Sequence, residues 1–310
     1  MSCPRLLNSD QPTSVVEHTK VENSSMSLRA LVQLVWMPGS ALIGTLGIQR
    51  YLDAPVDIAL ALMTVVLAVA IYALNRLTDV AEDAANSPER AQDRRTAMAL
   101  VFGSALFLLL SPFFLVLRSV VYALYGAVLV VGLAYSVRIV PYYSSGFRWL
   151  RLKDVLFLKA PVVAGVWFIC VMIIPWLQAG GWAVSINGVE FFMLSLAYFV
   201  ASLANTIYCD MRDEVGDQRS GIVTLPIRYG QKVCHAGLML VGGLVASLSI
   251  LLYGMGRLSG SHVIVVSVID VAYPVTIWWF HARMGPRGRG IVYLVESLDV
   301  LFTGAIFWFF

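Results

Sequence analysis

Long apolar stretches separated by short polar segments recur along this chain after a polar beginning. Each stretch holds about 20 residues, which as an α-helix is long enough to cross the hydrocarbon core of a bilayer. The stretches lie near residues 29–49, 55–78, 96–117, 118–137, 154–177, 189–210, 233–254, 262–283 and 290–310. The pattern therefore predicts an all-α, polytopic membrane protein of about nine transmembrane helices. Little more than Arg118 and Ser119 separates the third stretch from the fourth.

The composition supports a membrane protein. Hydrophobic residues make up 59% of the 310 positions and charged residues 13%, which is too apolar for one soluble core to bury. Residues 1–27 are polar and lack the basic start and apolar run of a signal peptide, so we expect a disordered cytoplasmic tail before one helical domain at 28–310. The four cysteines show no CxxC spacing, and the small net charge of +3 gives no indication of nucleic-acid binding.

The distribution of Lys and Arg predicts on which side of the membrane each loop lies. If the helices alternate in direction, all but three of the 22 basic residues fall in the tail and in loops on one side. The exceptions are Arg50, Arg118 and Arg257. Because loops rich in Lys and Arg stay in the cytoplasm, we expect a cytoplasmic amino terminus and an external carboxyl terminus.

Two acidic clusters end the second and sixth stretches, both on the predicted cytoplasmic side. Within each cluster the residues follow one another at intervals of three or four, which places their side chains on one face of a helix. The clusters are Asn75, Asp79 and Asp83, and Asp210, Asp213 and Asp217. A polar loop with Arg and Pro follows each cluster, which suggests two halves related by an ancient duplication.

The clustered carboxylates predict a metal site. Carboxylates at a membrane boundary repel one another and lose hydration, so a positive partner has to compensate them. Mg²⁺ prefers oxygen ligands and usually takes one or two carboxylates, leaving its other positions to water and substrate phosphate. Ordinary solvated helix ends explain one such cluster equally well, but two clusters with matching spacing and side favour a clamp in which Mg²⁺ holds a diphosphate.

Both clusters, segment 221–226 and the loop beginning Ala134-Tyr135-Ser136 resemble the UbiA superfamily of intramembrane prenyltransferases, over nearly the whole chain after the tail. The resemblance implies a nine-helix bundle around a central cavity for the isoprenyl chain, with both aspartate motifs at its cytoplasmic rim. It implies Mg²⁺ bound directly or through water by all six cluster residues, with Asp79, Asp83, Asp213 and Asp217 catalytic. The diphosphate partners expected from these loops are Tyr135, Arg138, Lys153, Lys159 and Arg212, although topology alone explains each basic residue equally well.

The leading hypothesis is Mg²⁺-dependent transfer of an isoprenyl group from a polyprenyl diphosphate to a lipid-soluble acceptor, through an allylic carbocation. A terpene cyclase of the same superfamily is the alternative, because it ionises the same donor without an acceptor. Aromatic prenyltransferases of the family commonly carry Arg before a proline in the first helix, whereas this chain has Met37 before Pro38.

Three further acids lie within the last two stretches: Asp270, Glu296 and Asp299. Carboxylates inside membrane helices usually face a polar interior and mark function. Here they would serve an acceptor or a proton, or, in a remote alternative, ion-coupled transport.

Overall fold

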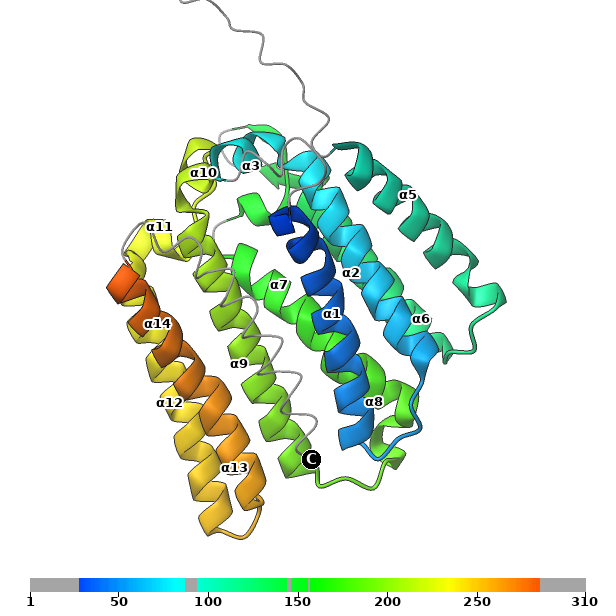
Figure 1. The fold of residues 1–310 in the computed structure, drawn as a ribbon, viewed down its shortest axis with the longest axis vertical. Coiled ribbons are helices and arrows are strands. Elements are labelled where there is room, and N and C mark those ends of the chain that lie inside the picture. Colours follow the sequence, from blue (N-terminus) through cyan, green and yellow to red (C-terminus); the bar gives the residue numbers. More distant parts are fainter. Residues whose placement is uncertain (1–27, 87–93, 144–145, 156, 285–310) are drawn as a thin grey trace, which may run out of the picture.

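The computed structural model describes residues 28–86, 94–143, 146–155 and 157–284, which form a bundle of helices (Figure 1). The long uninterrupted helices are α1 (Leu28–Tyr51), α2 (Ile58–Thr78), α5 (Arg94–Leu110), α6 (Ser119–Ser136), α9 (Gly188–Arg212) and α12 (Gln231–Gly254). In two other segments a turn of π-helix joins shorter α-helices. These are α7 (Lys159–Phe168) and α8 (Ile174–Ala179) around Ile169–Ile173, and α13 (Gly260–Ser267) and α14 (Tyr273–Met284) around Val268–Ala272.

Helices cover every predicted transmembrane stretch from the first to the eighth, so the all-α membrane fold is confirmed. Seven helical segments in the described part are long and apolar enough to cross a membrane, and α1 is a helix where the first stretch is predicted. The third and fourth stretches are separate helices, because α5 ends in a 3₁₀ turn at Ser111–Phe113 and α6 begins at Ser119. The ninth stretch and the predicted tail lie outside the described residues, so the count of nine stays a prediction.

The outer surface of the bundle is apolar. α5 lies at one edge and α12 with α13 at the opposite edge (Figure 1). More than half of the surface of Phe102 and Leu109 on α5, and of Leu240 and Leu244 on α12, is exposed. Contiguous apolar surface of this kind is unfavourable in water, so lipid is the solvent that suits it.

Asp57 holds three helices together at the end where α1 passes into α2. Its carboxylate caps α2 by accepting from the backbone N–H of Leu60 at 3.0 Å. The same carboxylate accepts from Gln178 Nε2 on α8 at 3.0 Å, and its backbone N–H donates to Gln49 Oε1 on α1 at 2.5 Å. Because these bonds satisfy polar groups at a helix end, they fix α1, α2 and α8 relative to one another.

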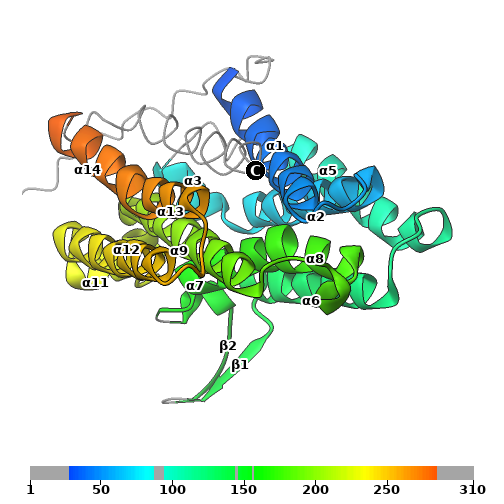
Figure 2. The same ribbon diagram turned by 90° about the horizontal axis from the view of Figure 1, so that it is seen from below.

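Short elements gather toward the other end of the bundle, where α2 and α9 end (Figure 1). They are α3 (Val80–Asn86), α10 (Glu214–Arg219), α11 (Leu225–Tyr229) and the 3₁₀ turn Leu152–Asp154. α10 packs against α3, so the segments that follow the second and sixth stretches meet. An antiparallel hairpin of β1 (Val140–Tyr143) and β2 (Phe147–Leu150) follows α6 and projects sideways from the bundle (Figure 2). The sequence predicts only a loop here.

Candidate functional site

The first acidic cluster spans a break between two helices. α2 ends before Asp79, which has φ −101° and ψ 23°, and α3 begins directly after it. Backbone hydrogen bonds continue through the break, since Asp79 N donates to Asn75 O at 2.9 Å and Asp83 N donates to Asp79 O at 2.8 Å. The prediction that all three residues belong to one helix needs correction, because the backbone at Asp79 leaves the α-helical conformation and Asp83 lies on α3. The three side chains nevertheless line the same cavity.

The second acidic cluster repeats this local structure. α9 ends before Asp213, which has φ −91° and ψ 8°, and α10 begins after it. Asp213 N donates to Cys209 O at 3.0 Å, and Asp217 N donates to Asp213 O at 3.0 Å. Asp210 therefore belongs to α9 and Asp217 to α10, so this cluster is also divided between two helices. The common long helix, aspartate cap and short helix agree with the predicted relation between the two halves.

Two basic side chains that follow the hairpin neutralise the first cluster. Lys153 Nζ lies 2.5 Å from Asp79 Oδ1 and 2.7 Å from Glu82 Oε2. Arg151 donates to Asp79 Oδ1 at 3.2 Å, and its NH2 lies 3.0 Å from Glu82 Oε1 and 2.7 Å from Asp154 Oδ1. The pairs with Asp79 and Glu82 are buried, and Asp154 is half-buried. Burial raises the pKa of Asp79 above its ordinary value, and attraction to Lys153 opposes that rise.

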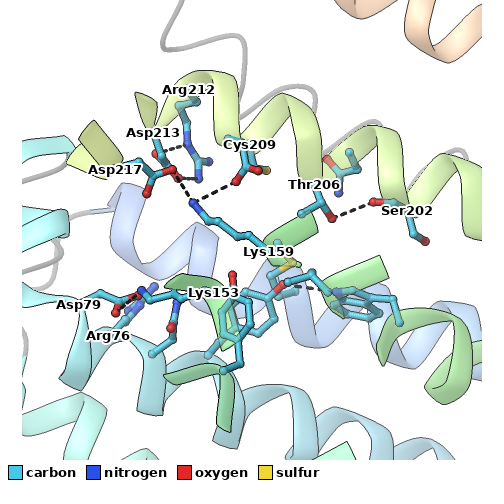
Figure 3. A pocket seen from close by; sticks show the side chains of 18 of the residues that line it. Arg76, Asp79, Lys153, Lys159, Ser202, Thr206, Cys209, Arg212, Asp213 and Asp217 are labelled. Atoms are coloured by element: carbon cyan, nitrogen blue, oxygen red, sulfur yellow. Dashed lines mark hydrogen bonds and ion pairs between the residues drawn. The ribbon is translucent and has the colours of Figure 1, made fainter. Parts of the chain in front are cut away.

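Lys159 and Arg212 neutralise the second cluster. Lys159 Nζ, at the start of α7, lies 3.0 Å from Asp210 Oδ1 and 2.5 Å from Asp217 Oδ2. Arg212 binds Asp213 with two hydrogen bonds, from Nε at 2.8 Å and from NH2 at 2.7 Å. Burial raises the pKa of Asp217 to about 6, and attraction to Lys159 opposes that rise. Figure 3 shows these pairs on one wall of the pocket, while Asp79, Arg76 and Lys153 lie together on another.

Both clusters line one cavity of about 210 Å³. The wall includes the following predicted site residues: Asn75, Asp79, Asp83, Tyr135, Lys153, Lys159, Asp210, Arg212, Asp213 and Asp217. Arg138 is exposed ahead of the hairpin and is not among the lining residues, so the structure does not bring it to the cavity.

Three charged residues of the site were not predicted from the sequence. Arg76 and Glu82 line the cavity, and Arg151 binds Asp79 at its wall. Glu82 stands within the first acidic segment, so its position was a usable signal. Arg151 differs in no sequence feature from the other basic loop residues, and only the folded chain shows its contacts.

The donor set of this cavity suits Mg²⁺. Among the residues that the structure describes, no three His, Cys, Asp or Glu side chains form a ready-made metal site. Mg²⁺ does not need one, because it takes one or two carboxylates and completes its coordination with water and phosphate. Several carboxylates and the Asn75 amide oxygen lie in the wall of this single cavity. The oxygen donors of the cavity therefore match those that Mg²⁺ prefers, and the roles of the six cluster residues as metal ligands stay a prediction.

A second, smaller cavity of about 100 Å³ lies between α2, α6 and α7. Its lining is mostly aliphatic, with side chains such as Leu67, Ile71 and Val166. Tyr72, Asn75, Tyr135, Val163 and Trp167 line both cavities, so the apolar one adjoins the charged one. The two together offer a charged head site with an apolar extension.

Asp270 lies apart from both cavities. It is 1% exposed, and neither carboxylate oxygen has a hydrogen-bond partner in the described structure. It does not line the charged or the apolar cavity. Glu296 and Asp299 lie outside the described residues, so the roles suggested for them in the sequence stay predictions.

The sequence profile of the UbiA prenyltransferase family matches residues 37–297, which is most of the chain and includes both acidic clusters. The chain belongs to the UbiA prenyltransferase family. The resemblance drawn from the aspartate motifs is thereby confirmed. No curated protein sequence matches the chain significantly.

Solved structures of UbiA proteins share this fold. A UbiA homologue from Archaeoglobus fulgidus bound to DMAPP and Mg²⁺ has a TM-score of 0.59 at 15% identity, over 92% of this chain and 100% of that chain. A UbiA homologue from the same organism bound to GPP and Mg²⁺ also gives 0.59, at 13% identity and the same coverage. A digeranylgeranylglyceryl phosphate synthase gives 0.57 at 15% identity, over 89% of this chain and 94% of that chain. At these identities the likeness establishes the fold.

Proposed function

We propose that this UbiA family member transfers an isoprenyl group from a polyprenyl diphosphate to a lipid-soluble acceptor, with Mg²⁺ as its cofactor. The observation that carries the proposal is the single cavity lined by both acidic clusters and by their basic partners. The adjoining apolar cavity suits a ligand with a charged head and an apolar chain. Solved relatives bound to DMAPP or GPP together with Mg²⁺ support this class of donor and this metal.

The polar residues of the cavity divide into metal ligands and diphosphate partners. Mg²⁺, when bound, supplies positive charge that stabilises the leaving diphosphate. The residues that would hold it are Asp79, Asp83, Asp213 and Asp217, with Asn75 and Asp210 beside them. Lys153, Lys159 and Arg212 place cationic donors in the same wall, where they contact phosphate oxygens, and Tyr135 adds a hydroxyl group.

The apolar part of the site handles the isoprenyl chain. Cleavage of the allylic carbon–oxygen bond leaves both bonding electrons on the diphosphate and a cation on the chain. The rings of Tyr72 and Trp167 line both cavities, and Trp167 Nε1 donates to Tyr72 OH at 3.3 Å, which holds the two rings together. Aromatic faces attract cations, so these rings stabilise the positive charge until the acceptor forms the new carbon bond and loses a proton.

Met37 constrains the acceptor. It lines the charged cavity at the position before proline where aromatic prenyltransferases commonly carry Arg. No basic residue occurs between Arg29 and Arg50. Since an unpaired buried charge is costly, the acceptor we propose is uncharged or keeps its charge outside the cavity. The same observation favours one second candidate, a terpene cyclase in which a double bond of the donor captures the cation.

The end of the bundle that holds the cavity is proposed to face the cytoplasm. Exposed Arg94, Arg95 and Arg219 lie toward this end, while Arg50 and Arg118 lie at the opposite ends of α1 and α6. This distribution agrees with the preference of Lys and Arg for the cytoplasmic side. Family membership, and acidic clusters at one end of the bundle, disfavour an ion-coupled transporter.

Product analysis tests the proposed reaction. Purified protein in lipid nanodiscs receives geranyl, farnesyl or geranylgeranyl diphosphate, with Mg²⁺ or EDTA, and with or without a membrane-lipid extract as the source of acceptor. We expect diphosphate release and a prenylated lipid only when Mg²⁺ and the extract are both present. A cyclic hydrocarbon or alcohol formed without the extract, in proportion to released diphosphate, would establish the cyclase instead. Efficient prenylation of 4-hydroxybenzoate would contradict the inference from Met37, and no turnover of any donor would contradict both candidates.

A further inference from the structure

The β1–β2 hairpin is an exposed, amphipathic element. In its antiparallel register Pro141 pairs with Trp149 and Tyr143 with Phe147, so these four side chains share one face. Tyr143, Phe147 and Trp149 are 79%, 50% and 52% exposed, although together they form an aromatic row. The ring centroids are 5.1 Å apart from Tyr143 to Phe147 and 5.1 Å apart from Phe147 to Trp149. A contiguous exposed aromatic face of this kind marks an interaction surface.

The opposite face of the hairpin is different. It carries the pair Tyr142 and Arg148 and, nearer the bundle, the half-buried pair Val140 and Leu150. Arg138 lies exposed just before the first strand. Segment 138–150 contains these two Arg residues and no Asp or Glu. The hairpin therefore combines an aromatic face with a positive charge that is not balanced within the segment.

The hairpin lies at the end of the bundle where the apolar helices α2 and α6 end. It follows α6, whose last residue Ser136 donates from Oγ to Asn75 Oδ1 at 3.4 Å. It ends just before Arg151, which binds Asp79. Both ends thus lie at the level of the cavity, where the membrane helices end. From there the hairpin extends sideways, away from the bundle and not along the helices (Figure 2). Phe157 and Tyr229, stacked with their centroids 6.0 Å apart, add exposed rings at the same end.

We propose that the hairpin lies in the headgroup region of the bilayer and binds acidic phospholipids. Its aromatic face points toward the acyl chains, because Trp and Tyr rings favour the boundary between headgroups and hydrocarbon. Arg138 and Arg148 then contact lipid phosphates, since a basic segment at the membrane surface attracts anionic headgroups. The second strand is followed by Arg151 and Lys153, which bind the first acidic cluster. The membrane contact is independent of the reaction proposed for the cavity.

Spin-label accessibility tests the position of the hairpin. In full-length protein with the native cysteines replaced, a spin label is attached to cysteine at Phe147, at Trp149 or at Ser220, which is an exposed residue after α10. The protein is reconstituted in phosphatidylcholine with phosphatidylglycerol and diluted with unlabelled protein. We expect labels at 147 and 149 to collide several-fold more with oxygen than with a water-soluble nickel chelate, and the label at 220 to show the reverse. A water-like ratio at both hairpin sites would overturn the proposal.

Lipid charge and self-association provide the second measurement. An environment-sensitive fluorophore at position 147 should shift to the blue when phosphatidylglycerol is added to phosphatidylcholine, and Arg138→Gln with Arg148→Gln should remove that shift. Equal spectra in both lipids would overturn the binding of acidic headgroups. A second copy of the chain could cover the aromatic face instead of lipid. Undiluted protein would then show dipolar broadening between labels at 147, and dilution with unlabelled protein would make the label accessible to water. That result would also overturn the proposal.

Discussion

Lys159 is the residue that joins the two helices of the second acidic cluster. It reaches from α7 to Asp210 and Asp217, which lie on α9 and α10. Without its charge, two largely buried carboxylates lie close together with no cation between them, and the diphosphate that we propose as ligand would lose a donor.

We therefore expect Lys159→Gln to lower turnover on the order of 100-fold, as is typical when one donor to a developing anion is removed. Lys159→Arg should keep more activity because it keeps the charge. Lys232→Gln, at an exposed position at the start of α12, is the matched control and should behave like wild type. The measurement is the initial rate of diphosphate release at saturating Mg²⁺. A rate near wild type for Lys159→Gln would remove this residue from the mechanism.

Arg138 and Arg151 differ in the role that the sequence predicts and the position that the structure gives. The sequence favoured Arg138 as a diphosphate partner, whereas the structure has Arg151 at the wall of the cavity and Arg138 in solvent-exposed chain. In detergent, Arg151→Gln should lower the melting temperature, because removing one partner of a buried ion pair costs roughly 3–5 kcal/mol. It should also lower turnover, while Arg138→Gln stays within about twofold of wild type. The opposite order of the two variants would restore the sequence prediction.

The spacing of the acids was enough to predict where the site lies, but not how its charges pair. Intervals of three and four residues at the ends of two apolar stretches pointed to facing carboxylates, and these residues do line one cavity. The partners Arg151 and Lys153 come from a segment about 70 residues away from Asp79 in the chain. Pairing over such a distance depends on how the hairpin and α7 pack, which periodicity along the sequence does not contain.

The packing of α12 against the π-helical turn between α13 and α14 depends on Gly242. A Cβ atom at Gly242 would overlap the backbone carbonyl oxygen of Asp270 in the π-helical turn, whereas a Cβ at Gly243 meets open space. Gly242→Ala should therefore destabilise the protein by about 1–3 kcal/mol, the usual cost of overpacking. Gly243→Ala should be neutral or slightly stabilising, because Ala favours helix over Gly. Thermal unfolding of the two variants in detergent checks this, and equal melting temperatures would contradict the close contact.

The helices were predictable and their interruptions were not. Runs of about 20 apolar residues have few alternatives to a membrane helix, so even the short separation at Arg118 and Ser119 gave two helices. The spacing of three and four suggested one continuous helix through each acidic cluster. The structure instead has a long helix that ends at Asp79 or Asp213 and a short helix that begins after it. The prediction for segment 138–153 rested on its charges and did not include a hairpin. Its alternating aromatic residues, Tyr143, Phe147 and Trp149, are a usual strand signal.

The proposed orientation of the molecule in the membrane predicts which side of the membrane each loop faces. Cysteine at Ser220, after α10, should react with an impermeant thiol reagent in inside-out vesicles and not in intact cells, in a background without native cysteines. Cysteine at Ser261, at the start of α13, should show the opposite pattern, because the two exposed positions belong to opposite ends of the bundle. Labelling of Ser220→Cys from outside intact cells would reverse the proposed orientation.

The central claim for the whole molecule is that both acidic clusters serve one Mg²⁺-dependent ionisation of a prenyl diphosphate. Asp79→Asn and Asp213→Asn each remove one charge and no bulk from the two equivalent helix breaks, and melting temperatures establish that the variants are folded. The most direct test is the rate of diphosphate release by wild type, by each variant and by the double variant, with excess Mg²⁺ and with EDTA. Because residues that act in one step are not additive, each single change should abolish most turnover, the double change should cost little more, and EDTA should abolish wild-type turnover. Full activity in EDTA, or rates near wild type in both folded single variants, would contradict the claim.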